Sequence, residues 1–154
     1  NDTDFEASYR ERCYSLFISE LKPILGVEEV IQSLTVPCCV ASNAPHKKMD
    51  ITLPASGLEK YFSRDRIFSA YDVQKWKPEP ALFLHAAKQM NVHPSKCIVI
   101  EDTWSGVMGA VNANIHVLAY NPHFDTRLYL NGVSNFGNMQ GIQSYLLDRL
   151  SKNS

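Results

Sequence analysis

The sequence predicts an α/β protein built on a doubly wound, parallel, Rossmann-like sheet. Four short apolar runs are typical of buried parallel strands, at residues 37–41, 67–69, 97–100 and 115–119. Between them lie segments whose apolar residues recur at three- and four-residue spacing, as in amphipathic helices. Alternation of such strands and helices favours a parallel sheet with helices on both faces. Polar residues follow directly after several of these runs, where open α/β sheets bind their ligands.

Composition fits a single globular domain. The chain has 154 residues, of which 45% are hydrophobic and 20% charged, with a formal net charge of -1. That charge gives no basic surface for nucleic acid or for an anionic membrane, so we expect neither partner. No apolar run approaches the length of a membrane span, and the first residues do not form a signal peptide, so we expect a cytoplasmic protein.

The four cysteines do not form a metal-binding pattern. None belongs to a C-x-x-C pair, and the adjacent Cys38 and Cys39 would point to opposite faces of a strand. The spacing therefore argues against zinc. We expect the thiols to be small buried side chains in a reducing compartment.

The N-terminal region predicts two helices. Apolar residues recur at helical spacing over residues 5–21, and Pro23 ends this segment. Residues 22–25 are expected to be a short link. A second helix follows over residues 27–34, and its apolar face predicts packing against the sheet.

The remaining helices follow the predicted strands. Pro45 is well placed to begin a helix over residues 45–54, and Pro80 begins the next one, whose apolar stripe ends at Met90. Residues 104–113 form a third, closed by Asn114, which tolerates a left-handed cap. A last helix is marked by four apolar residues at helical spacing, namely Ile142, Tyr145, Leu146 and Leu150.

Three polar groups are expected to converge at the carboxyl edge of this sheet. Ser42 and Asn43 follow the first strand, Lys77 lies where a helix begins, and Glu101 and Asp102 end the third strand. The hydroxyl, amide and ammonium groups suit phosphate oxygens, whereas two carboxylates at a strand end suit Mg²⁺. The combination indicates phosphoryl chemistry.

Each group also has a simpler interpretation. Ser42-Asn43 could only cap a helix, a Lys-Pro pair is often a solvated turn, and Glu101-Asp102 could be a charge pair at a helix N-terminus. Their order and their places at strand ends favour the shared site over three unrelated features.

These motifs resemble the haloacid dehalogenase superfamily. Ser42 at a strand end, Lys77-Pro78 before a helix, and Ile100-Glu101-Asp102-Thr103-x-x-Gly106 match its second, third and fourth motifs. The stretches 68–81 and 86–92 resemble its β-phosphoglucomutase-like subgroup, and within it the bacterial sugar-acid phosphatases of the 6-phosphogluconate phosphatase type. The resemblance covers about residues 5–150.

The resemblance implies a Mg²⁺-dependent hydrolase of small phosphorylated metabolites that works through an aspartyl-phosphate. In the family the nucleophile belongs to an Asp-x-Asp-Gly-Thr motif that ends the central strand. Here Asp2-Thr3-Asp4 is followed by Phe5-Glu6 and is preceded by no apolar strand. We therefore expect a chain that lacks the central strand and is inactive by itself, with the last cap helix and hinge at residues 1–25 and the core at 26–154.

The resemblance assigns roles to the candidate residues. Lys77 and Ser42 would be catalytic, Ser42, Asn43 and Lys77 would bind the substrate phosphate, and Glu101 and Asp102 would hold Mg²⁺. A phosphomutase of the same superfamily and a non-catalytic phosphate-binding or assembly protein remain alternatives. The missing strand also leads us to expect self-association through unpaired strand edges.

Overall fold

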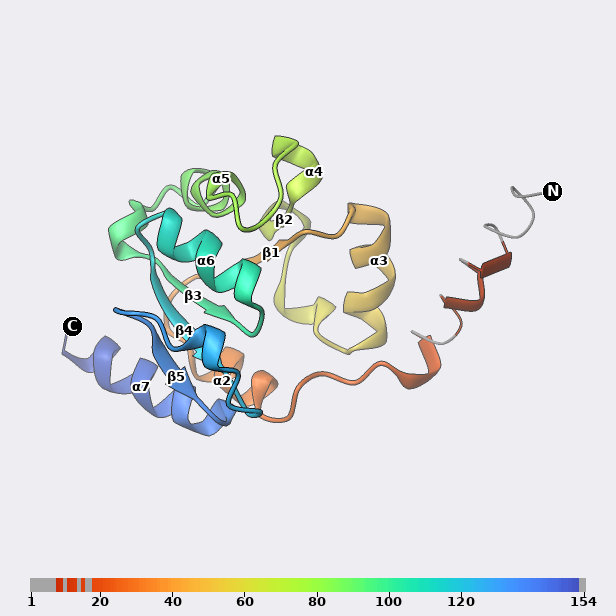
Figure 1. The fold of residues 1–154 in the computed structure, drawn as a ribbon. Coiled ribbons are helices and arrows are strands. Elements are labelled where there is room, and N and C mark those ends of the chain that lie inside the picture. Colours follow the sequence, from red (N-terminus) through yellow and green to blue (C-terminus); the bar gives the residue numbers. More distant parts are fainter. Residues whose placement is uncertain (1–7, 10, 14, 16–17, 153–154) are drawn as a thin grey trace.

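The computed structural model describes residues 8–9, 11–13, 15 and 18–152. Within this range, residues 8–9, 11–13, 15 and 18–20 are helical, in agreement with the helix expected at the N-terminus. Phe5, Leu16 and Phe17, which contribute to its predicted apolar pattern, lie outside the described residues, as do Asp2 and Asp4. Figure 1 shows residues 18–20 away from the strands, joined to them by an extended link. The boundary expected at residue 25, between the cap helix with its hinge and the core, stays a prediction.

The strands form two parallel sheets rather than one continuous sheet. β1 (Val40–Ser42) pairs with β2 (Ile67–Ser69), and β3 (Ile98–Glu101), β4 (His116–Tyr120) and β5 (Ser134–Phe136) form a second sheet in that order. All three pairings are parallel, as the sequence predicted. Among the described residues β1 and β3 are not paired with each other, so each leaves one edge open toward the middle of the fold (Figure 1).

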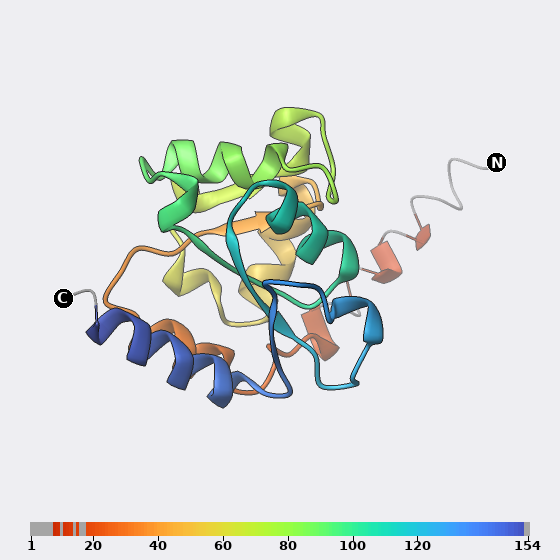
Figure 2. The same ribbon diagram turned by 60° about the vertical axis from the view of Figure 1, so that its left-hand side comes forward.

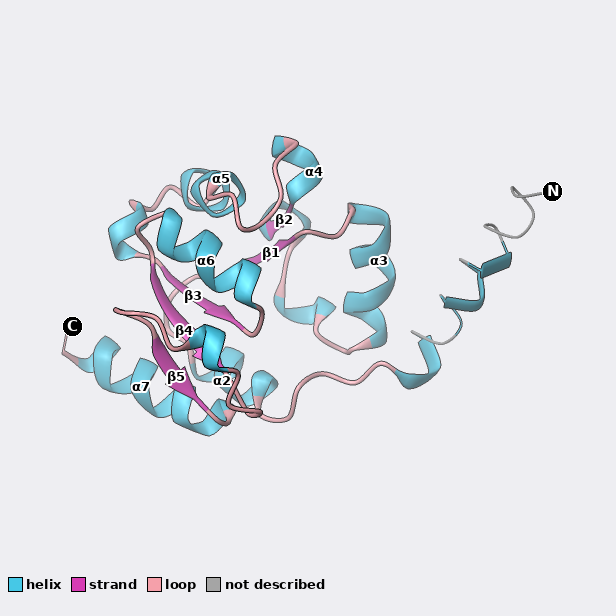
Figure 3. Ribbon diagram, in the orientation of Figure 1, coloured by secondary structure: helices cyan, strands magenta, loops and turns pink. Residues whose placement is uncertain are grey.

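Helices cover both faces of these strands (Figure 3). The longer helices agree with the predicted ones to within a few residues: α2 (Val27–Ser33), α3 (His46–Ala55), α5 (Ala81–Gln89), α6 (Trp104–Asn112) and α7 (Met139–Ser151). Shorter pieces lie between them: α4 (Ala70–Val73) and the 3-10 turns η1 (Glu59–Tyr61), η2 (Arg64–Arg66), η3 (Pro94–Lys96) and η4 (Thr126–Leu128). No helix among the described residues combines the length and the apolar character needed to cross a bilayer.

Two apolar layers fix the helices against the second sheet. On one side α2 and α7 lie together, as Figure 2 shows, and bury Val30 and Ile142 against Leu118 of β4. On the other side α6 buries Val107 and Ala110 against β4. Burial of this kind contributes roughly 1.5–3 kcal/mol for each large apolar side chain. β4 is therefore the most deeply buried strand of the second sheet, and β3 lies between it and the open edge.

Three differences from the sequence prediction concern short elements. The strand expected at 37–41 begins only at Val40. No apolar run predicts β5, whose residues are Ser134, Asn135 and Phe136. α4 is a single turn held by a capping box between Ser69 and Asp72. These elements are set by tertiary pairing and local capping rather than by hydrophobic periodicity.

A cavity of about 650 Å³ separates β1 from β3. It is lined mainly by apolar side chains from β1, β3, α2, α5 and α7. The two strands that face it are less buried than their outer neighbours: β2 is buried along its whole length and β1 is not, and the middle of β4 is buried whereas Ile100 of β3 is 39% exposed. The fold is thus a doubly wound parallel arrangement with an open position in its middle.

Candidate active site at the carboxyl ends of the strands

Lys77 lies at the carboxyl ends of both sheets and connects them. Its Nζ donates a hydrogen bond of 2.9 Å to the carbonyl of Ala41 in β1 and forms an ion pair with Oε1 of Glu101 in β3. The side chains of Lys77 and Glu101 are only 9% and 10% exposed. The ammonium also lies 4.8 Å from the ring centroid of Phe83. A cation is therefore held with little freedom where the sequence predicted a phosphate site.

The second oxygen of Glu101 is bound by the start of α6. Oε2 accepts hydrogen bonds from the backbone N–H of Asp102 at 3.2 Å and from Oγ1 of Thr103 at 3.1 Å. Thr103 Oγ1 in turn accepts from the N–H of Gly106 and caps the helix. Gly106 is needed at this turn because a Cβ there would lie 2.0 Å from Cδ of Glu101. The Glu-Asp-Thr-x-x-Gly spacing is therefore explained by the space around one carboxylate.

Ser42 and Asn43 form the turn that leaves β1. Ser42 Oγ accepts a hydrogen bond of 3.1 Å from the N–H of Ala44, which leaves its hydroxyl hydrogen available to a ligand. Oδ1 of Asn43 accepts from the backbone N–H of Lys77 at 2.9 Å. Asn43 thus fixes the lysine loop, while its side-chain N–H groups are available as donors. The loop is tied to β2 because Ser69 Oγ donates to the Ala44 carbonyl at 2.7 Å.

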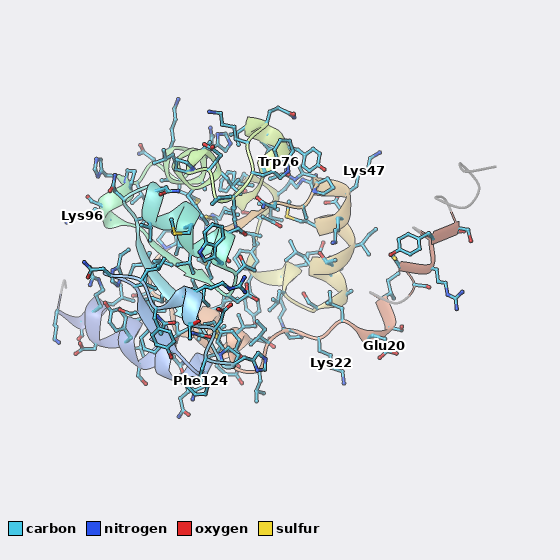
Figure 4. The ribbon with its side chains drawn as sticks, in the orientation of Figure 1. Glu20, Lys22, Lys47, Trp76, Lys96 and Phe124 are labelled. Carbon is cyan, nitrogen blue, oxygen red and sulfur yellow. The ribbon has the colours of Figure 1, made fainter. Side chains whose placement is uncertain are left out.

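Lys77, not Lys75, points into the junction between the two sheets. Lys75 is exposed, and Trp76 packs edge-on against Tyr71 with ring centroids 5.3 Å apart. Figure 4 shows Trp76 beside α4, on the surface. On the opposite side of the loop, Nδ2 of Asn112 in α6 donates to the Pro78 carbonyl at 3.0 Å. This positioning contact was not predicted, since no motif relates Asn112 to the loop.

A histidine-carboxylate pair beside the site was also missed. Nε2 of His46, the first residue of α3, lies 2.9 Å from Oδ1 of Asp72 in α4. Burial acts to raise the pKa of Asp72, but hydrogen bonds from the Ser69 N–H and from His46 prevail, and the pKa lies below its ordinary value. The pair joins the start of α3 to the turn that precedes Lys77. His46 and Lys47, which follow Pro45, match no motif that would predict this pair.

The described residues fit a magnesium site only in part. Asp102 is exposed next to Glu101, and in the hydrogen bonds among the described residues its carboxylate has no partner. Glu101 is already bound to Lys77. Across the described part of the chain no three carboxylate, histidine or cysteine side chains come together as a metal site. Mg²⁺ is often held by one or two carboxylates together with waters and phosphate oxygens, so Asp102 is a suitable first ligand. The metal roles of Glu101 and Asp102 stay predictions.

Known proteins resemble this chain in sequence and in fold. The family of haloacid dehalogenase-like hydrolases matches residues 2–114. The 6-phosphogluconate phosphatase of Escherichia coli is 40% identical over 123 residues, which are 79% of this chain. A candidate β-phosphoglucomutase from Thermotoga maritima superposes with a TM-score of 0.85 at 26% identity, covering 96% of this chain and 70% of its own. A haloacid dehalogenase-like protein of unknown function from Agrobacterium tumefaciens gives a TM-score of 0.81 at 28% identity, with the same coverage.

The chain spans 55% of the length of the E. coli relative. The match to the family runs from residue 2 to residue 114 and so contains Ser42, Lys77 and Asp102. On this basis the chain belongs to the haloacid dehalogenase-like hydrolases.

Proposed function

We propose that this chain carries the phosphate-binding half of a phosphomonoester hydrolase. The observation that supports it best is the nearly buried Lys77 ammonium, held between Ala41 and Glu101 at the ends of two parallel strands. A fixed cation at this position would stabilise the charge that develops on a transferring phosphoryl group. The hydroxyl of Ser42 and the side-chain N–H groups of Asn43 would bind the other phosphate oxygens.

We propose a sugar phosphate or sugar-acid phosphate as the substrate class. The support is the 40% identity to 6-phosphogluconate phosphatase of E. coli, together with 30% identity over 106 residues to a phosphorylated carbohydrates phosphatase of T. maritima. Both relatives are longer than the part they share with this chain. The partner expected is thus a small phosphorylated metabolite. Four free cysteines support the expected reducing, cytoplasmic compartment.

The nucleophile is proposed to come from outside the described residues. The carboxylates at the site are Glu101, which is paired with Lys77, and Asp102, which is free to bind a cation. Neither is therefore assigned as the group that would form an aspartyl-phosphate. When bound by Asp102, Mg²⁺ would supply charge neutralisation at the phosphate. Because Asp2-Thr3-Asp4 is followed by Phe5-Glu6 rather than by Gly-Thr, we expect residues 1–154 alone to show no turnover.

The proposal can be tested in a protein completed with the part of the E. coli relative that the alignment leaves uncovered. We expect this protein to release phosphate from 6-phosphogluconate only in the presence of Mg²⁺. Asp102→Asn should lower the rate roughly 100-fold or more, since even the outer partners of a metal ligand contribute 10- to 100-fold. Asp65→Asn, at an exposed aspartate in η2, is the matched control. Near-normal activity of Asp102→Asn would remove the metal assignment.

A phosphomutase is the second candidate, supported by the structural likeness to the T. maritima protein. The same completed protein distinguishes the two reactions. A hydrolase releases inorganic phosphate in proportion to substrate consumed, whereas a mutase converts one sugar phosphate into its isomer without net release. If the completed protein binds phosphate but performs neither reaction, the non-catalytic alternative is favoured.

A further inference from the structure

The turn that follows β1 is tied to α4 by a closed ring of hydrogen bonds. Ser69 Oγ donates to the carbonyl of Ala44 at 2.7 Å, and the N–H of Ser69 donates to Oδ2 of Asp72 at 2.8 Å. Nε2 of His46 lies 2.9 and 3.0 Å from the two carboxylate oxygens of Asp72. Pro45 joins His46 to Ala44 and closes the ring. The turn is therefore held at two points, by its own carbonyl and by the first residue of α3.

The ring has a buried half and a half that reaches the surface. Ser69 is fully buried, whereas the side chains of His46 and Asp72 are each 30% exposed. Burial acts to raise the pKa of Asp72, but hydrogen bonds from Ser69 and His46 lower it below its ordinary value, so the carboxylate stays an acceptor at neutral pH. Partly exposed ion pairs of this kind usually contribute little to stability. The contact is therefore better explained by the geometry that it imposes.

The imidazole of His46 is oriented by this contact alone. Its other ring nitrogen, Nδ1, is buried and makes no hydrogen bond in the part of the chain that the structure describes. A buried nitrogen without a partner is unfavourable, and such groups persist where the surroundings hold a particular geometry. With the proton on Nε2, the ring donates to Asp72. A change at either residue would release the ring and the start of α3.

The ring also reaches the lysine loop. Only residues 73–76 separate Asp72 from Lys77. At the other end of this loop, the N–H of Lys77 donates to Oδ1 of Asn43 at 2.9 Å. The turn after β1 and the lysine loop are thus connected twice, directly through Asn43 and indirectly through His46 and Asp72.

We propose that His46 and Asp72 are positioning residues of the phosphate site. Their contact fixes the turn after β1, so that Ser42 and Asn43 present their donors to one phosphate group. This role depends on the proposed phosphate site, but neither residue touches the phosphate itself. Since a small displacement of an oriented group can lower a rate by up to ~10²-fold, loss of the contact affects phosphate binding and turnover more than it affects folding.

Variants of the completed protein described above test this role. His46→Leu removes the donor to Asp72 and should lower kcat/KM for 6-phosphogluconate about tenfold, as expected for a misplaced group. His46→Gln retains an N–H at a similar reach and should stay within about threefold of the parent protein. The matched control is Lys60→Gln, which removes the ion pair between Lys60 in η1 and Glu28 in α2 and should leave kcat/KM unchanged.

A second background shows whether His46 acts through the turn. In a protein that already carries Ser42→Ala, His46→Leu should lower kcat/KM by no more than about threefold, because one of the donors that it positions is gone. Affinity for inorganic phosphate, measured by calorimetry, should follow the same pattern. A merely structural role would give the same factor in both backgrounds. Urea denaturation establishes that each variant is folded.

If His46→Leu is unfolded, Asp72→Asn replaces it. The amide keeps one oxygen for the N–H of Ser69 and loses the acceptor that faces His46, so the same tenfold loss of kcat/KM is expected, about that of a misplaced group.

The outcomes separate this role from the hydrolase proposal. Equal factors in both backgrounds, or a loss in His46→Gln as large as in His46→Leu, would overturn the positioning role and leave the hydrolase intact. Phosphate binding that shows the expected pattern without phosphate release would remove the hydrolase and retain the positioning role. A folded protein that binds no inorganic phosphate would overturn both.

Discussion

At the residue scale, both carboxylate oxygens of Glu101 are bound. Lys77 pairs with one carboxylate oxygen, and the N–H of Asp102 and the hydroxyl of Thr103 donate to the other. A nearly buried charge is tolerated only when it is paired and hydrogen-bonded in this way. Removing one partner would leave the other charge unpaired, so these residues act as a unit.

Gly106→Ala tests how tightly this unit is packed. The added Cβ would lie 2.0 Å from Cδ of Glu101, so the carboxylate must move and the ion pair with Lys77 must weaken. We expect the free energy of unfolding to fall by about 1–3 kcal/mol, as for other overpacked sites. Urea denaturation measures this change in the free energy of unfolding. Gly137→Ala is the control, since a Cβ there meets no atom within 4 Å. Equal stability of the two variants would show that the turn at Gly106 is not constrained by Glu101.

The sequence could predict those site residues that lie near the carboxyl ends of the strands. Ser42, Lys77 and Asp102 lie at the carboxyl edge because parallel strands bring their ends together. The His46-Asp72 and Asn112-Pro78 contacts could not be predicted, since they join positions 26 and 34 residues apart that no motif or periodicity relates. The roles of the predicted residues toward phosphate and Mg²⁺ stay predictions.

At the scale of elements, α7 is joined to β4 by a polar contact within an apolar layer. Nε2 of His116 lies 2.9 Å from the hydroxyl of Tyr145, and the two rings are stacked. Burial lowers the pKa of His116 below its ordinary value, and the charge of Arg149 adds to the effect. The folded protein therefore favours the neutral imidazole of His116.

This contact predicts a pH dependence of stability. A lowered pKa in the folded state means that the unfolded state binds more protons below about pH 6.5, so stability is present above that pH and is lost as the pH falls through the folded pKa. His116→Gln should flatten the dependence of the unfolding free energy between pH 7 and pH 5. His123→Gln, at an exposed histidine, should retain it. Identical slopes for wild type and His116→Gln would contradict the assignment.

Helices with a clear apolar stripe could be predicted within a few residues, because periodicity and proline mark them. β5 could not, since Ser134, Asn135 and Phe136 become a strand only through pairing with β4. The strand expected from residue 37 begins later because Pro37 has no N–H and the neighbouring cysteines line the cavity.

For the whole molecule, the open edges of β1 and β3 predict self-association. Unpaired strand edges and an apolar cavity of about 650 Å³ both favour contact with another chain. Sedimentation of residues 1–154 should show a concentration-dependent increase in mass. A monodisperse monomer at all concentrations would show that the edges are protected by the fold itself.

The open position agrees with the expectation, drawn from the resemblance, that the sheet lacks its central strand. The sequence could not show that the two sheets stay apart rather than close on each other. The structure accounts for it. α2, α6 and α7 pack on the second sheet, α5 packs on β1 and β2, and Lys77 links Ala41 to Glu101. Closing the gap would require these packed layers to move together.

The central claim is that Lys77 is the phosphate-site cation of a phosphomonoester hydrolase. The most direct test is phosphate release from 6-phosphogluconate by the completed protein carrying either Lys77→Ala or Lys75→Ala. The account predicts a loss of roughly 10²–10³ in turnover for Lys77→Ala, comparable to removal of one oxyanion donor, and near-normal turnover for Lys75→Ala. Normal turnover of Lys77→Ala, or a greater loss for Lys75→Ala, would contradict it.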